Sequence, residues 1–158
     1  MINAELHDLA TDNQHIALGS YTAFLQWILK QLLSLTKAKI VWLSTTPAPT
    51  NPPTALFSER TQSAVIAYNK AADTVVDDAR EITGSARIEP TCNLFEAVCG
   101  VCAPASASAS DLASASAPTD KCAYSTCPLQ EPGGIHYEAA GWDLLGKTVH
   151  ACLSRVQL

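Results

Sequence analysis

Histidine is the side chain best suited to acid–base chemistry near neutral pH, and one of the four histidines stands at a position typical of a functional loop. His136 follows the glycine pair Gly133 and Gly134 and comes just before a helical pattern. Two glycines let the backbone turn freely, so the imidazole can be presented as a general base. The structural alternative is a histidine that caps the following helix or packs at its start.

A second histidine lies near the amino terminus, where Leu6 ends a short apolar stretch. His7 and Asp8 cannot pair merely by being neighbours, because successive side chains diverge in an extended chain. Both can still line a pocket at the end of a strand. The alternative is a polar loop in which Asp8 bonds nearby backbone groups as an Asx turn.

Six cysteines form the third group with potential chemistry. Cys99 and Cys102 have the spacing C-x-x-C, and they are followed by Cys122 and Cys127. We expect at least one disulfide among these four, with Cys127 bonded to Cys99 or Cys102 and Cys122 available to the other. A four-cysteine zinc site and free redox thiols remain as alternatives. Cys152, on the inner face of the last predicted helix, is expected to be an inert buried thiol.

The elements that position these residues follow from hydrophobic periodicity. Apolar residues recur at three and four residues in three segments, which predicts helices at residues 14–38, 61–83 and 138–156. The run KIVWLS at residues 39–44 has no polar alternation, so it predicts a strand covered on both faces. A short strand at residues 86–89 and a helical turn at residues 93–98 complete the pattern. Strands alternating with helices predict an α/β fold with a parallel sheet.

Composition excludes several classes of protein. The apolar fraction is 47% and the charged fraction 16%, so the chain can bury a core in one domain spanning residues 1–158. Ten basic against fifteen acidic residues give a net charge of −5 without a basic cluster, which argues against a nucleic-acid partner. No segment has the roughly 20 apolar residues of a membrane span. Residues 103–121, rich in Ala and Ser, are expected to form a flexible insertion.

Four segments together resemble the later part of the SGNH (GDSL-type) hydrolase family. They are NAELHDL, similar to the third block; KIVWLSTTP, similar to a buried strand and its loop; AYNKAA, similar to a helix; and CPLQEPGGIHYEAAGWDLLGKTV, similar to the fifth block. The resemblance spans nearly the whole chain apart from the insertion. It implies a flavodoxin-like three-layer α/β/α fold, here truncated at its amino end, that hydrolyses small-molecule or carbohydrate esters without a cofactor or metal.

The resemblance also assigns roles and shows departures. It implies that His136 is the catalytic base, that His7 faces the oxyanion, and that Asp8 supports the pocket. The first-block serine is missing, so we expect the isolated chain to show no turnover. Gly133 stands where the family has the Asp that orients the base, so a carboxylate from elsewhere, or none, must serve. The oligomeric state is left open.

Two other functions remain open at this stage. One is a non-catalytic binding module that keeps the same fold, and the other is a zinc-stabilised structural domain. The cysteine pattern is typical of secreted proteins, although the first residues do not form a signal peptide. We therefore expect a secreted protein, or one in the lumen of the secretory pathway, whose given chain lacks its natural amino terminus.

Overall fold

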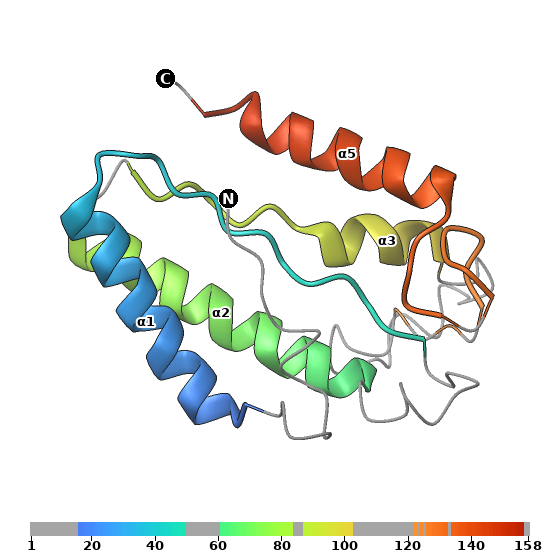
Figure 1. The fold of residues 1–158 in the computed structure, drawn as a ribbon, viewed down its shortest axis with the longest axis horizontal. Coiled ribbons are helices and arrows are strands. Elements are labelled where there is room, and N and C mark those ends of the chain that lie inside the picture. The colour runs from blue at the N-terminus through green and yellow to red at the C-terminus, as the bar shows by residue number, and fades with distance from the viewer. Residues whose placement is uncertain are drawn as a thin grey trace, which may run out of the picture.

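The computed structural model describes residues 16–49, 61–83, 87–102, 122, 124, 126–132 and 134–156. These residues form four helices and no strand: α1 Leu18–Leu35, α2 Gln62–Thr83, α3 Leu94–Cys102 and α5 Ala139–Leu153 (Figure 1). The predicted α/β fold with a parallel sheet is therefore wrong for the part of the chain that is described, which is all-α.

The helices themselves follow the sequence periodicity closely. Helix α2 matches its predicted bounds to within one residue. Helices α1 and α5 are shorter at both ends than predicted, and the expected turn at residues 93–98 is the nine-residue helix α3. The carboxyl end of α1 is closed by Arg87, whose guanidinium donates to the carbonyl oxygens of Leu33 and Thr36. This cation satisfies acceptors that a helix end otherwise leaves open.

Helices α1 and α2 pack side by side through one face of each (Figure 1). Tyr21, Leu25 and Leu29 recur every four residues on α1 and are buried. The ring of Tyr21 lies 5.0 Å from that of Tyr68 on α2, and the Tyr68 hydroxyl donates to the carbonyl of Ile16. Burying a side chain of this size contributes about 1.5–3 kcal/mol, so this face dominates the stability of the pair.

Two extended segments, residues 39–49 and 87–93, meet only in isolated parallel bridges, Ile40 with Ile88 and Leu43 with Cys92. The bridged residues are three positions apart on the first segment and four on the second, so the register slips by one residue between them. The interrupted register explains why these segments do not form strands.

The first extended segment is nevertheless buried on both faces, as its sequence predicts. Ile40 and Trp42 join the core formed with α1 and α2, whereas Val41 and Leu43 face partly buried side chains of α5. Figure 1 shows both extended segments running between the α1–α2 pair and the α3–α5 pair. The alternation of side chains thus joins the two helix pairs into one body.

Three disulfides crosslink this arrangement: Cys92–Cys152, Cys99–Cys122 and Cys102–Cys127. The first ties α5 to the second extended segment, and the other two tie α3 to the chain ahead of α5. The expectation that Cys152 is a free buried thiol is wrong, because helix α5 brings it to Cys92. With all six cysteines paired, no thiolate is available for the zinc site or the redox thiols considered above.

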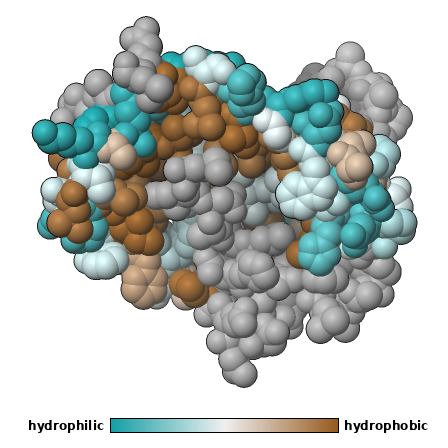
Figure 2. All heavy atoms as spheres, turned by 45° about the horizontal axis from the view of Figure 1, so that its top comes forward, coloured by the Kyte–Doolittle hydropathy of each residue, from teal (hydrophilic) through white to brown (hydrophobic). Residues whose placement is uncertain are grey.

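The apolar residues of α1 are not all covered. Phe24, Trp27 and Leu35 are more than half exposed, on the side away from the buried stripe. The apolar residues extend around more of the helix surface than α2 covers. The buried face of α1 is therefore narrower than the apolar face that the sequence periodicity predicts. Hydrophobic atoms accordingly reach the surface drawn in Figure 2. No helix among the described residues is long and apolar enough to cross a membrane.

Candidate functional site

The clearest candidate site is a hairpin around His136, the first of the two histidines singled out from the sequence. We define the His136 hairpin as residues 129–138, of which Gly133 lies outside the described residues. Gln130 and Tyr137 form an antiparallel bridge, and the N–H of Glu131 donates to the carbonyl of His136 at 3.0 Å. A turn bond from the N–H of Gly134 to the carbonyl of Glu131, 2.9 Å, closes the tip.

The base of the His136 hairpin is held against α5. The N–H of Glu138 donates to the carbonyl of Leu129, and α5 begins at the next residue. Gly141 faces this junction: a Cβ there would lie 2.5 Å from Cδ1 of Tyr137 and closer still to the carbonyl of Leu129. Only a glycine lets helix and hairpin approach this far, so the helix fixes where the hairpin points.

At the tip of the hairpin an imidazole and a carboxylate face each other. Nδ1 of His136 lies 3.7 Å from Oε2 of Glu131, and these side chains are 70% and 55% exposed. The hairpin bonds place residues 131 and 136 opposite each other across the turn. The exposure leaves the imidazole accessible to a bound molecule.

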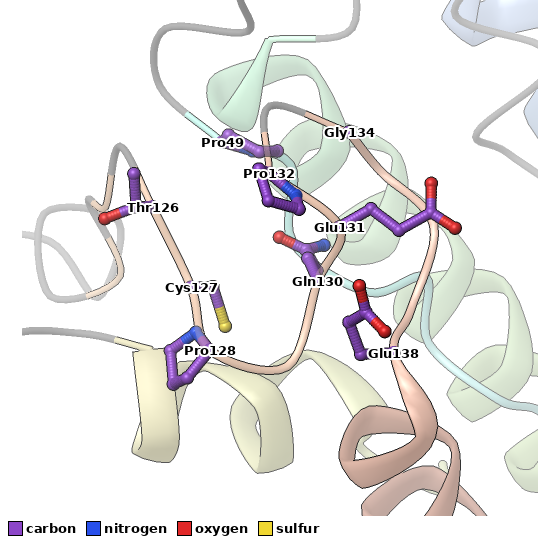
Figure 3. A pocket seen from close by; sticks show the side chains of 9 residues that line it. All are labelled: Pro49, Thr126, Cys127, Pro128, Gln130, Glu131, Pro132, Gly134 and Glu138. Atoms are coloured by element: carbon purple, nitrogen blue, oxygen red, sulfur yellow. The ribbon is translucent and has the colours of Figure 1, made fainter.

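A pocket of about 540 Å³ opens beside the hairpin and is shown in Figure 3. Its lining comes from the first extended segment, from residues 126–128 and from the hairpin: Pro49, Thr126, Cys127, Pro128, Gln130, Glu131, Pro132, Gly134 and Glu138. His136 is not itself part of the lining, but Glu131, Gly134 and Glu138 on either side of it are. Three prolines and two carboxylates give the pocket rigid apolar walls and acceptor groups at its edge.

The wall formed by the first extended segment is fixed by a buried amide. Asn69 on α2 accepts from the N–H of Thr45 at 2.8 Å and donates to its carbonyl at 2.9 Å. Both backbone groups are thus satisfied away from water, as buried polar groups require. The bonds of Asn69 thus give the backbone of Thr45 a structural role.

A buried tyrosine connects that wall to the hairpin. The Tyr124 hydroxyl lies 2.9 Å from the carbonyl oxygen of Pro47 and 3.0 Å from Oε1 of Gln130. Burial raises the pKa of Tyr124 and that of Tyr137, and neighbouring Gln130 opposes the rise in both. Both phenols therefore stay neutral at physiological pH. The Tyr124 hydroxyl links the wall to Gln130 of the hairpin in a buried region beneath the pocket, whereas that of Tyr137 has no hydrogen-bond partner among the described residues.

Two disulfides anchor Cys122 and Cys127, which precede the hairpin, to the same region. Cys127 lines the pocket and is bonded to Cys102 at the end of α3. Cys122 is bonded to Cys99, and its carbonyl accepts from Nε2 of Gln62 on α2 at 2.7 Å. These links fix the approach to the hairpin from two helices, although the intervening residues 103–121 lie outside the described part.

The other sequence-predicted site residues cannot be placed. His7 and Asp8 lie outside the described residues, as does the insertion at residues 103–121. Within the described ranges, no group of three or more His, Cys, Asp or Glu side chains is arranged to hold a metal.

Sequence reasoning missed Glu131 and Glu138, because it expected any carboxylate partner of His136 to come from another loop. The signal lay in the tripeptide Pro132–Gly133–Gly134, which is typical of a tight turn. Such a turn brings residues five apart to face each other.

Comparison with known proteins adds no assignment. No family model, no curated protein and no solved structure matches the chain. The three disulfides are typical of proteins from an oxidising compartment, such as the extracellular space.

Proposed function

We propose that His136 is the general base of a site that hydrolyses carboxylic esters in a secreted protein. The observation that carries this proposal is an exposed imidazole on a turn that is held at its base by α5 and lies beside a pocket. Histidine contributes to catalysis when it is fixed within reach of substrate and remains accessible, and the hairpin supports both conditions.

The chemistry assigned to the imidazole is a proton relay. An attacking hydroxyl forms a bond to the ester carbonyl carbon while its proton passes to Nε2 of His136. The tetrahedral intermediate then collapses, the bond to the leaving alkoxy oxygen breaks, and the imidazolium returns the proton to the departing alcohol. Where the hydroxyl is that of water, the acid is released in this step; where it belongs to the protein, water attacks the acyl-enzyme by the same relay and releases the acid. His136 is thus the base, and no nucleophile is assigned among the described residues.

The pocket suits the alcohol or acyl part of such a substrate. Its proline walls can pack on carbon–hydrogen surfaces, and Thr126 and Gln130 offer hydrogen-bonding groups to a neutral substrate. The carboxylates of Glu131 and Glu138 at its edge would repel an anionic substrate. We therefore propose neutral small-molecule or carbohydrate esters as the substrate class.

The test is hydrolysis of p-nitrophenyl acetate by the full product of the gene and by the present chain. We expect the full product to be active and His136→Ala to lower kcat by about 10³-fold or more, as loss of a catalytic base does. His150→Ala, on the exposed last turn of α5, is the matched control and should leave kcat unchanged.

We expect the present chain alone to stay at the background rate. A full product without esterase activity, or one whose kcat survives His136→Ala, overturns the proposal. If the gene encodes only these residues, absence of turnover overturns it as well.

A further inference from the structure

We infer that Glu131 is the positioning residue for His136, an assignment that rests on the proposed function. The pattern of the fifth block puts the orienting carboxylate three residues before the histidine, where this chain has Gly133. The structure instead brings a carboxylate from five residues before it. The juxtaposition is Oε2 of Glu131 at 3.7 Å from Nδ1 of His136.

The backbone, more than the two side chains, creates this juxtaposition. The bond from the N–H of Glu131 to the carbonyl of His136 pairs the two residues across the hairpin. The neighbouring bridge between Gln130 and Tyr137 fixes the same register one residue further down. Residues paired in this way have their Cβ atoms close together, so the carboxylate and the imidazole are always within reach of each other.

The chemical consequence follows from the two nitrogens of the ring. A carboxylate at Nδ1 favours the tautomer that carries its proton there, which leaves the lone pair on Nε2 for a substrate hydroxyl. The same negative charge stabilises the imidazolium that forms when that hydroxyl is deprotonated. Separations of catalytic groups are commonly long without substrate, and 3.7 Å closes to a hydrogen bond by a small side-chain rotation.

The other carboxylate of the pocket provides the contrast. Glu138 also lines the pocket and is exposed, but it has no ion pair with His136 in the described residues. It lies two residues after the histidine, so it is not paired with it across the hairpin. If negative charge near the pocket were all that mattered, substituting either glutamate would affect His136 equally. If Glu131 positions the ring, only substitutions of Glu131 should affect it.

The direct test is the tautomer of His136, read from two-bond nitrogen–proton NMR spectra of the present chain at a pH where the ring is neutral. We expect the proton on Nδ1 in the wild type. We expect a loss of this preference in Glu131→Gln and in Glu131→Ala, and an unchanged tautomer in Glu138→Gln. Because the pair is exposed, neither change at Glu131 should unfold the protein. An unchanged tautomer in both Glu131 variants overturns the inference.

The kinetic test uses the full product of the gene. Glu131→Gln should lower kcat by about 10–100-fold, less than in a buried triad because water screens this pair. KM should change little, since the charge acts on the transition state, and Glu131→Asp should retain more activity than Glu131→Gln. Equal losses in Glu131→Gln and Glu138→Gln overturn positioning.

The spectra separate this inference from the function on which it rests. If the tautomer of His136 depends on Glu131 but ester hydrolysis does not depend on His136, the proposed function is overturned. The positioning of His136 by Glu131 then still stands.

Discussion

Gly141→Ala is the most informative change to the packing beneath the site. The added Cβ would lie 2.5 Å from Cδ1 of Tyr137, whereas carbon atoms in contact prefer about 3.5–4.0 Å. Neither Tyr137, which is buried, nor the backbone of Leu129 is a flexible chain end, so α5 and the hairpin must separate by about 1 Å. Overpacking of this kind costs about 1–3 kcal/mol.

A matched control lies on the same helix. A Cβ at Gly146 meets nothing within 4 Å, so Gly146→Ala should gain the full helix propensity of alanine, about 0.8–1 kcal/mol. The same gain offsets part or all of the clash at Gly141, which leaves a net loss of about 0–2 kcal/mol there. The two variants have the same composition and should differ by the cost of the clash alone, about 1–3 kcal/mol.

Urea denaturation of both variants measures this difference, and a thermal scan should separate their midpoints by roughly 2–12 °C for a chain of this size. Because Gly141 holds the hairpin in place, its variant should also hydrolyse the ester more slowly. A Gly141→Ala protein at least as stable as Gly146→Ala would refute the close approach of α5 to the His136 hairpin.

Three further predictions concern the framework. Replacing Cys92 and Cys152 by alanine should lower the free energy of unfolding by about 4 kcal/mol, and replacing Cys99 and Cys122 should lower it by about 3.5 kcal/mol. The first disulfide has the larger effect because it closes the longer loop, 60 against 23 residues. Denaturation midpoints in the reverse order would contradict this. Asn69→Leu should cost about 2–4 kcal/mol, since both backbone groups of Thr45 lose their partner in a buried place; urea titration giving less than about 1 kcal/mol would exclude that role. Burial raises the pKa of Asp73, so its folded form binds a proton more tightly than the unfolded one, and stability is lost as pH rises through the raised pKa. Asp73→Asn should therefore be more stable than wild type at pH 7, with a smaller gain at pH 4, and a gain independent of pH would disprove the assignment.

Local features of the fold could be predicted from the sequence because local patterns determine them. The four-residue recurrence of Tyr21, Leu25 and Leu29 indicates the buried stripe of α1, and the uninterrupted apolar run at residues 40–43 indicates burial on both sides. Hydrogen-bond pairing between distant segments is not local. A one-residue slip in register separates the two bridges between residues 39–49 and 87–93, and the prediction of a sheet did not take account of it.

The candidate site also contains one residue that the sequence could predict and others that it could not. A histidine between a glycine pair and a helix pattern pointed to His136, because the signals lie within a few residues. Glu131 could not be found by counting to a fixed spacing, since a hairpin pairs residues by turn geometry. Asn69 and Tyr124 support the pocket from distant elements, and Cys152 reaches Cys92 only through the path of α5. Contacts of this kind depend on tertiary packing, which periodicity does not encode.

The central claim is that His136 acts as the base and that Glu131 acts only through it. The most direct measurement is a double-mutant cycle on kcat for p-nitrophenyl acetate, using His136→Ala, Glu131→Ala and the double variant of the full gene product. The account predicts that Glu131→Ala lowers kcat in the wild-type background but changes nothing once His136 is alanine, because residues that act as a unit are not additive. Losses that multiply in the double variant, or a His136→Ala protein with wild-type kcat, would contradict it.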